Sequence, residues 1–317
     1  MKLVVVTGCL GFIGSYVTER LLKEGFKVLG VDKVTYAANK SLIGEYSRNK
    51  NFTFLKEDIC ELRYLPDCDY VINIAAESHV GNSIIDDTEF IKSNLTGVQN
   101  LLQLIKLKPK NIGISPILFH FSTDEVYGDV AKGNLDEDSL LNPSNPYAAL
   151  KAAADILIKS WHRTFGIDYI LIRPVNNYGN NQYPEKLVPL TVKALQRGKK
   201  IILHDNGSPV RTWLHAEDTA DAVFKIINSG VKNEIFNISS EYEQKNIDTV
   251  KKIIDTYFEK DDINYDDFLD FSYNREGQDV RYGVDCEKIK KIGWSAEKKF
   301  DSEIIKIVKH YKGKFIW

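Results

Sequence analysis

Cysteine is sparse in this chain of 317 residues, and its four copies are spread so that no CxxC pair occurs. Neither a disulfide framework nor a structural zinc site is therefore indicated. The six histidines form no HExxH motif, so no metal ion is expected. Without signs of disulfide bonding, a reducing cytoplasm is the expected location.

Long apolar runs and an excess of one charge are also missing. No apolar stretch approaches the roughly 20 residues that cross a membrane, and the first run, residues 3–6, is too short for a signal peptide. The net charge of −2 gives no field to attract nucleic acid or an anionic membrane. An anionic substrate would have to be held by local groups.

Apolar β-branched runs alternate with helical patterns through the first half of the chain. Strands that alternate with helices, and that are apolar nearly throughout, predict an α/β fold with a doubly wound parallel sheet. The expected strands are residues 2–7, 26–31, 51–56, 70–75, 117–121 and 169–173, and the expected long helices are 88–106 and 146–165.

The second half is less regular and suggests a smaller, mostly helical α/β domain. Helices are expected near 189–197 and 217–229, short strands at 201–203 and 234–238, and a functional loop over 176–189. The expected first domain spans residues 1–175 and is rejoined by about 212–240. The second domain takes residues 176–211 and 241–317.

Three glycines, Gly8, Gly11 and Gly14, stand between the first strand and the helix that follows it. The first permits a tight turn, the second lets the backbone approach a pyrophosphate, and the third allows close packing of helix on strand. The helix N-terminus supplies N–H donors and a positive dipole. This context predicts a Rossmann dinucleotide site.

Two aspartates follow later strands. Asp32 ends the second strand, where a carboxylate can accept both ribose hydroxyls and would repel a 2′-phosphate, so NAD is favoured over NADP. Asp58 follows the third strand and could reach the adenine or cap a helix, two roles that the sequence leaves open.

Tyr147 and Lys151 lie four residues apart on an expected helix and therefore share one face. A free phenol has a pKa of about 10 and is a poor base. A nearby ammonium and a charged nicotinamide would lower that pKa and make the phenol a usable base. Downstream of a dinucleotide motif, this pair predicts a catalytic base and its support.

Asp124 and Glu125 stand just after the fifth strand, at the edge where open α/β sheets bind ligands. The usual reading of adjacent carboxylates is a solvated loop pair or a helix cap. Their place at the carboxyl end of a buried strand favours a catalytic pair.

These segments resemble the extended short-chain dehydrogenase/reductase superfamily and, within it, the nucleotide-sugar 4,6-dehydratases. The triplet at 123–125 discriminates, since related epimerases lack the acid pair. Gly81 and Val280 depart from the family pattern, which often has Asp and Arg there, and the change to Val280 weakens one phosphate or sugar contact. The matching segments are residues 7–14, 32–37, 75–80, 122–128, 145–151, 176–179, 184–187, 211–214 and 279–282.

The resemblance implies an NAD that stays bound and is regenerated in each turnover. The residues implied to hold it are Gly8, Gly11, Phe12, Ile13, Gly14, Asp32, Lys33, Thr35, Asp58, Ile59, Ala75, Ala76, Ser122, Tyr147, Lys151 and Asn177. Those implied to hold a nucleotide sugar are Ser78, Thr123, Asn176, Glu185, Lys186, Leu187, Arg211, Asn246, Asp279, Arg281 and Tyr282. For Asn246, plain surface polarity is an equal alternative.

The family mechanism assigns a role to each reacting group. Thr123 hydrogen-bonds the sugar 4-hydroxyl while Tyr147 takes its proton. Glu125 removes the C5 proton, and a protonated Asp124 releases the C6 hydroxyl as water. Neighbouring carboxyls can hold different protonation states. Lys151 fixes the nicotinamide ribose and supports the phenolate. The product would be an NDP-4-keto-6-deoxyglucose for deoxysugars such as rhamnose.

Alternatives remain for the reaction and the substrate. An NDP-sugar epimerase or decarboxylase shares the fold, and a non-catalytic Rossmann regulator would share only the cofactor site. The loop 180–183 and the short segment from 128 to 147 resemble UDP-glucose relatives more than dTDP-glucose enzymes, which weakly favours UDP-glucose.

A homodimer is expected from the helices 88–106 and 146–165, through which family members commonly pair. Both helices show apolar residues beyond one core stripe, and a helix buried on two faces needs a second partner. The alternative is that these residues all face the sheet. They are Leu101, Leu102, Ile105, Ile156, Leu157 and Trp161.

Overall fold

The apolar runs of the first half form a seven-stranded parallel sheet in the computed structural model, which describes residues 1–108, 115–260, 262–274 and 276–313. Its spatial order is β10-β6-β5-β4-β1-β2-β3. The order reverses between β1 and β4, and open α/β sheets bind ligands at such a reversal. The strands are β1 (Leu3–Thr7), β2 (Lys27–Asp32), β3 (Phe52–Lys56), β4 (Tyr70–Asn73), β5 (Ile117–Phe121), β6 (Tyr169–Pro174) and β10 (Glu234–Ile238).

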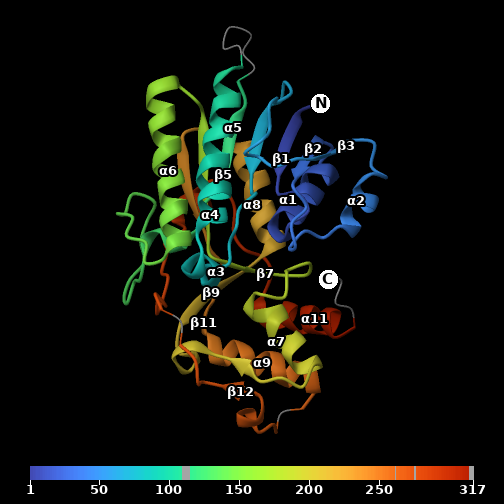
Figure 1. Ribbon diagram of the computed structural model, residues 1–317, viewed down its shortest axis with the longest axis vertical. Coiled ribbons are helices and arrows are strands. Elements are labelled where there is room, and N and C mark those ends of the chain that lie inside the picture. Colours follow the sequence, from blue (N-terminus) through green and yellow to red (C-terminus); the bar gives the residue numbers. More distant parts are fainter. Residues whose placement is uncertain (109–114, 261, 275, 314–317) are drawn as a thin grey trace.

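Helices cover both faces of this sheet, as Figure 1 shows. Val4 and Val6 pack in the core shared with α1 and α8, whereas Val5 packs with α5 and α6 on the other face. Because neighbouring strand residues point to opposite faces, both faces of β1 must be apolar. The expected α/β class is confirmed. The covering helices are α1 (Phe12–Lys23), α8 (Ala216–Ser229), α5 (Gly97–Lys106) and α6 (Pro146–Phe165).

The helix expected over 88–106 is not a single α-helix. It consists of α4 (Thr88–Ile91), a π-helical turn η1 (Lys92–Thr96) and α5. In addition, Leu101, Leu102 and Ile105 are all buried within the chain, at 0–1% exposure. The expectation that these three form a second apolar face for a partner is wrong, because α5 packs on both the sheet and α6.

The second half forms a smaller lobe at the bottom of Figure 1. An aromatic core holds Tyr178, Trp213 and Phe300 together. The loop expected at 176–189 contains one short strand and the start of a helix. The lobe's elements are β7 (Asn176–Tyr178), α7 (Leu187–Gln196), β8 (Ile201–Ile202), β9 (Val210–His215), β11 (Glu243–Lys245), α9 (Asn246–Phe258), β12 (Leu269–Asp270) and α11 (Phe300–Gly313).

Short elements complete the chain between the lobes. Among the helices of the described residues, none has both the length and the apolarity to span a bilayer. The four cysteines are all free thiols. Two further short elements are α3 (Val80–Ile85) and the 3-10 turn η3 (Asp124–Tyr127).

Candidate active site

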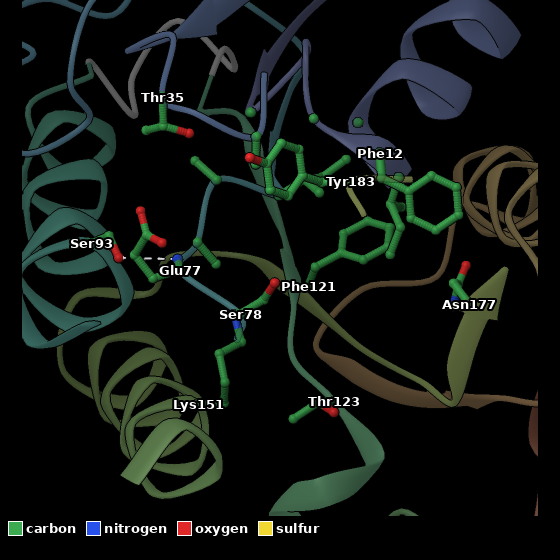
Figure 2. A pocket seen from close by; sticks show the side chains of 18 of the residues that line it. Phe12, Thr35, Glu77, Ser78, Ser93, Phe121, Thr123, Lys151, Asn177 and Tyr183 are labelled. Atoms are coloured by element: carbon green, nitrogen blue, oxygen red, sulfur yellow. Dashed lines mark hydrogen bonds between the residues drawn. The ribbon is translucent and has the colours of Figure 1, made fainter. Parts of the chain in front are cut away.

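A pocket lies at the carboxyl edge of the large sheet, where the strand order reverses, and Figure 2 shows it from close by. The smaller lobe closes it with loop residues 182–186. Every residue expected to contact the cofactor lines this pocket, and so do Thr123, Asp124 and Glu125. The structure therefore brings the residues expected to bind the cofactor and the triplet expected to act on the sugar together in one cavity.

Two of the three glycines are required by close backbone contacts. A Cβ on Gly8 would lie 2.8 Å from the amide nitrogen of Ala75, and Gly8 has φ +69°. A Cβ on Gly14 would lie 1.9 Å from the carbonyl oxygen of Gly8. The first turn of α1 begins at Gly11 with no side-chain cap, so its N–H groups stay open to an anion. This cradle fits a dinucleotide pyrophosphate.

Asp32 is held rigidly at the end of β2. Its two carboxylate oxygens accept hydrogen bonds from the N–H groups of Leu10 at 3.0 Å and Val34 at 2.8 Å. Burial raises the pKa of Asp32. Val34 has φ +63°, which is costly for a β-branched residue. Backbone strain beside a pocket is typical of functional sites, and the fixed carboxylate fits a ribose diol.

Asp58 lies at the same end of the pocket, close to two lysines. Its Oδ2 lies 3.8 Å from Lys33 Nζ and 3.7 Å from Lys92 Nζ, and its Oδ1 accepts from the N–H of Cys60 at 2.9 Å. The carboxylate therefore stabilises the local turn and also lines the pocket. The described residues between Asp58 and β4 contain no helix, so Asp58 caps a turn and not a helix.

The π-helical turn supports the loop after β4. The N–H of Glu77 donates to Ser93 Oγ at 3.2 Å, drawn as a dashed line in Figure 2, and to Asn94 Oδ1 at 2.9 Å. Asn94 Nδ2 returns a hydrogen bond to the Glu77 carbonyl at 2.8 Å. This loop lines the pocket from Ala75 to Ser78. π-Helical turns occur frequently at functional sites.

The two neighbouring carboxyls differ in their surroundings. Asp124 is buried, and its Oδ2 has no hydrogen-bond partner, while its Oδ1 accepts from Thr123 Oγ1 at 3.2 Å. Burial and the charge of Glu125 raise the pKa of Asp124 to about 8. Asp124 therefore keeps its proton at neutral pH and can act as an acid, as the sequence predicts.

Glu125 is only partly buried and lies near two neutral polar side chains. Asn145 Nδ2 lies 3.3 Å and Tyr282 Oη 3.4 Å from its Oε2. Tyr282 also donates to Asp279 at 2.6 Å. Glu125 therefore lies in the same pocket as the acid Asp124, in position to act as a base.

Tyr147 and Lys151 enter the pocket from α6, and Figure 2 draws the side chain of Lys151. Burial lowers the pKa of Lys151 to about 8, and the charge of Asp155 opposes that shift. Burial and the charge of Glu125 raise the pKa of Tyr147, while a hydrogen bond with Thr123 lowers it. The expectation that the lysine lowers the phenol pKa is not met in the protein alone.

Five of the residues expected to bind a nucleotide sugar line the pocket: Ser78, Thr123, Asn176, Glu185 and Lys186. Asn176 Oδ1 is buried without a partner, so this amide has capacity for a ligand. Lys186 Nζ donates to the carbonyl of Ser78 at 2.6 Å. Leu187 instead packs in the aromatic core of the smaller lobe.

The other expected substrate residues lie outside this lining. Arg211 donates to the carbonyls of Val210 and Asp279 and lies over the ring of Tyr282 at 4.6 Å. Asp279 accepts from Ser144 and Tyr282. Asn246 begins α9, with its Oδ1 buried and unpartnered. The structure thus places Tyr282, Asp279 and Arg211 in a supporting layer behind Glu125.

Arg281 has no free donor for a phosphate. Its Nε donates to Glu243 at 3.0 Å, with Nη2 2.7 Å from the other Glu243 oxygen. Its remaining contacts are the carbonyls of Val130 at 3.3 Å and Gly133 at 2.7 Å, and Asn134 Oδ1 at 3.0 Å. Five acceptors match the five donors of a guanidinium. The expected phosphate contact is therefore not formed by this arrangement.

Some pocket residues were not predicted from the sequence. Tyr183 lines the pocket from the smaller lobe, and its ring lies 5.1 Å from that of Tyr36. Glu77 lines it from the loop after β4. The loop composition signalled a functional segment but not which side chains point inward. Within the described residues, no group of three His, Cys, Asp or Glu could hold a metal ion.

Comparisons with known proteins agree with this geometry. Residues 5–307 match the family model described as GDP-mannose 4,6 dehydratase. A dTDP-glucose 4,6-dehydratase of Haemophilus influenzae is 36% identical, with 98% of each chain covered. The dTDP-glucose 4,6-dehydratase 1 of Escherichia coli is 35% identical, covering 99% of this chain and 94% of that one. A dTDP-glucose 4,6-dehydratase of Streptomyces venezuelae, solved with NAD, superimposes with a TM-score of 0.89 at 33% identity over 98% and 97% of the two chains.

Proposed function

Because the chain belongs to the nucleotide-sugar 4,6-dehydratases of the extended short-chain dehydrogenase/reductase superfamily, we propose that it converts dTDP-glucose to dTDP-4-keto-6-deoxyglucose with NAD as its cofactor. One observation carries the proposal. The buried carboxyl of Asp124, with one unpartnered oxygen, lies in the same pocket as Glu125, Tyr147 and Lys151. Oxidation and water elimination need these four groups together.

NAD suits the residues at the other end of the pocket. The cradle around Gly8 and Gly14 would hold the pyrophosphate, and Asp32 the adenosine ribose. Lys151 would hold the nicotinamide ribose. Bound there, NAD would supply the hydride acceptor for the sugar C4 and the hydride donor for C6. Relatives solved with NAD bound support this choice.

The protein's own groups then move the protons. Thr123 orients the 4-hydroxyl, and Tyr147 removes its proton. Once C4 is a ketone, the C5 hydrogen is acidic, and Glu125 removes it. Asp124 gives its proton to the departing C6 hydroxyl, which leaves as water. Finally, Glu125 returns a proton to C5. Asp124 acts in the protonation state that its surroundings favour, whereas the phenol of Tyr147 must lose a proton from a buried position.

The nucleoside is proposed from the relatives and not from the pocket. The sequence weakly favoured UDP-glucose, but the most similar curated proteins are named dTDP-glucose 4,6-dehydratases, which does not support that preference. Thymine and uracil differ by one methyl group, so binding alone would discriminate about fivefold. We assign residues 176–211 and 241–317 to nucleotide-sugar binding and the remainder to the cofactor.

Steady-state kinetics with product masses test the proposal. The purified protein is assayed with dTDP-glucose, UDP-glucose, GDP-mannose and UDP-glucuronic acid, and kcat/KM is compared. We expect a product lighter by one water, with the highest kcat/KM for dTDP-glucose. An isomer of unchanged mass would identify a 4-epimerase, and loss of carbon dioxide from a uronic acid substrate would identify a decarboxylase. Either result overturns the proposal.

We also propose that the protein acts as a homodimer that pairs through α4 and α6. Ile156 on α6 is 60% exposed and Ile91 on α4 is 42% exposed. Large apolar side chains on neighbouring helices favour burial against a second copy. This proposal does not rest on Leu101, Leu102 or Ile105, which face the interior.

A further inference from the structure

A row of polar side chains crosses the apolar sheet beneath the pocket. Thr7 on β1 is the register partner of Asn73 on β4, and Asn73 is the register partner of His120 on β5. Thr7 Oγ1 lies 2.6 Å from Asn73 Oδ1, and the Asn73 amide lies 3.0 Å from His120 Nδ1. All three residues are at most 1% exposed. Such burial is costly unless the groups satisfy one another.

The row ends on Lys151. His120 Nε2 lies 3.4 Å from Lys151 Nζ, which reaches it from α6. Val5, Val71 and Leu118, each two residues earlier on the same strands, pack in the core shared with α6. Because strand residues alternate, the polar row lies on that same face. The sheet register therefore aims His120 at the lysine.

The direction of these hydrogen bonds follows from charge. Burial and the charge of Lys151 hold the pKa of His120 well below its usual value, so the ring is neutral and carries one N–H. An ammonium has only donors, so Nε2 must accept and the proton must sit on Nδ1. In the structure Asn73 Oδ1 faces Thr7 and Nδ2 faces His120. The proton on Nδ1 therefore requires the amide to be turned over, with its oxygen toward Nδ1 and its nitrogen toward Thr7. Amide orientation is assigned by such a network.

We infer that His120 is a positioning residue for Lys151: its Nε2 accepts a hydrogen bond from Nζ, and Asn73 and Thr7 hold the ring in place. This inference rests on the proposed function, in which Lys151 supports the phenolate of Tyr147. Lys151 then has three neighbouring side chains. Tyr147 and Asp155 lie on its own helix, α6, and His120 lies on β5. Asp155 is itself paired with Arg173 on β6 at 3.0 Å.

Three substitutions separate positioning from packing. His120→Gln places an amide oxygen near Nε2 and keeps the contact with Lys151. His120→Asn keeps the contact with Asn73 but is too short to reach Nζ. His120→Leu removes both contacts. The rate of sugar oxidation is measured in a single turnover, from the absorbance of the reduced cofactor, across a range of pH.

Positioning predicts a specific order of rates. His120→Leu and His120→Asn should slow oxidation about tenfold, the loss expected for one hydrogen bond to a charged group. Their alkaline limb should move to lower pH, because the ammonium loses an acceptor that stabilises it. His120→Gln should stay near the wild type. Equal rates for Gln and Asn, or a wild-type rate and pH profile for Leu, overturn the inference.

Further measurements test the inference even if one of the variants does not fold. If His120→Leu does not fold, the comparison of Gln with Asn decides. Nitrogen-15 NMR of labelled histidines should show the proton of His120 on Nδ1, and a proton on Nε2 would overturn the inference without any activity assay. Lys151→Met separates the two proposals. If that variant oxidises sugar normally, the proposed role of Lys151 fails; if it is inactive while the His120 variants are normal, only the present inference fails.

Discussion

Tyr36 and Glu185 join the two lobes across the mouth of the pocket. The hydroxyl of Tyr36, on the loop after β2, donates to Glu185 Oε2 at 3.1 Å. The Tyr36 ring also meets that of Tyr183, and Lys186 bonds to the carbonyl of Ser78. A dinucleotide in the pocket would lie behind these contacts. Such contacts would slow the release of a cofactor bound in the pocket.

Replacing Tyr36 with Phe should speed the release of NAD. The ring contact with Tyr183 remains, but the hydrogen bond to the Glu185 carboxylate is lost. Since Tyr36 is half exposed, the effect is modest, about threefold to tenfold in the release rate. Release is followed by dilution into a trap for free cofactor. Tyr64→Phe, on an exposed loop away from the pocket, is the matched control. An unchanged release rate would show that the hydrogen bond does not limit opening.

Glu125→Gln should oxidise the sugar but stop before water elimination. The phenol of Tyr147 still takes the 4-hydroxyl proton, whereas no other carboxylate base stands at C5. Reduced cofactor should therefore appear in a single turnover and persist, with product formation reduced at least a hundredfold. Absorbance and product mass are measured together. Glu61→Gln, which is exposed and outside the pocket, serves as control. Product formation at the wild-type rate would exclude Glu125 as the base.

The Tyr147→Phe variant should be blocked at the oxidation of the sugar, one step before the Glu125→Gln variant. Without the phenol, the 4-hydroxyl keeps its proton, so the reduced cofactor should not accumulate when sugar is added. Phe keeps the ring packed against Val80 and Phe90, and we expect a melting temperature close to that of the wild type. Stopped-flow absorbance checks the first point and thermal unfolding the second. A normal transient would remove Tyr147 from the oxidation step.

Asp124→Asn should make the protein more stable, and increasingly so as pH rises. The folded-state pKa of about 8 lies above the ordinary value of 3.8. Between these values, the unfolded chain releases the proton that the folded chain keeps, so the wild type loses stability as pH rises. Asn does not titrate. The difference in melting temperature should grow to on the order of 5 °C by pH 8 and then level off. A difference independent of pH would contradict the raised pKa.

The same variant should be unable to eliminate water. For the wild type, the dehydration rate should fall above about pH 8, because Asp124 then loses the proton that it must donate. Product mass measured from pH 6 to pH 9 checks this decline.

Ile156→Glu should dissociate the proposed dimer. A charge at the centre of an apolar interface is left without a partner and costs several kcal/mol. Light scattering at micromolar concentration should give twice the chain mass of 36.1 kDa for the wild type and the single mass for the variant. Ile202→Glu places the same charge on β8 in the smaller lobe, at 50% exposure, and should remain dimeric. A wild-type mass near 36.1 kDa would defeat the proposal.

The sequence predicts the cofactor end of the site well, because local rules position it. Gly8 must turn, Asp32 must end its strand, and both lie at the carboxyl edge of the sheet by topology alone. Every expected cofactor residue accordingly lines the pocket.

The substrate end is predicted less well, because long side chains there choose among distant partners. The sequence shows that residue 281 is an arginine, but not which groups its guanidinium contacts. Its acceptors on residues 130–134 are distant in the sequence and come close only when the chain folds. The role of His120 could not be predicted from the sequence for a similar reason. A histidine within an apolar strand gives no sign of its register with Asn73 or of its distance from Lys151.

The π-helical turn at Lys92–Thr96 has a consequence for insertions and deletions. It holds one residue more than α-helical geometry would, and one residue corresponds to about 100° of rotation. That offset lets α5 keep its apolar side on the sheet while Phe90 on α4 packs against Tyr147. Deleting one residue from this turn would therefore leave the sheet covered and swing Phe90 away from the tyrosine. Chain length at this point sets the orientation of one half of the helix relative to the other.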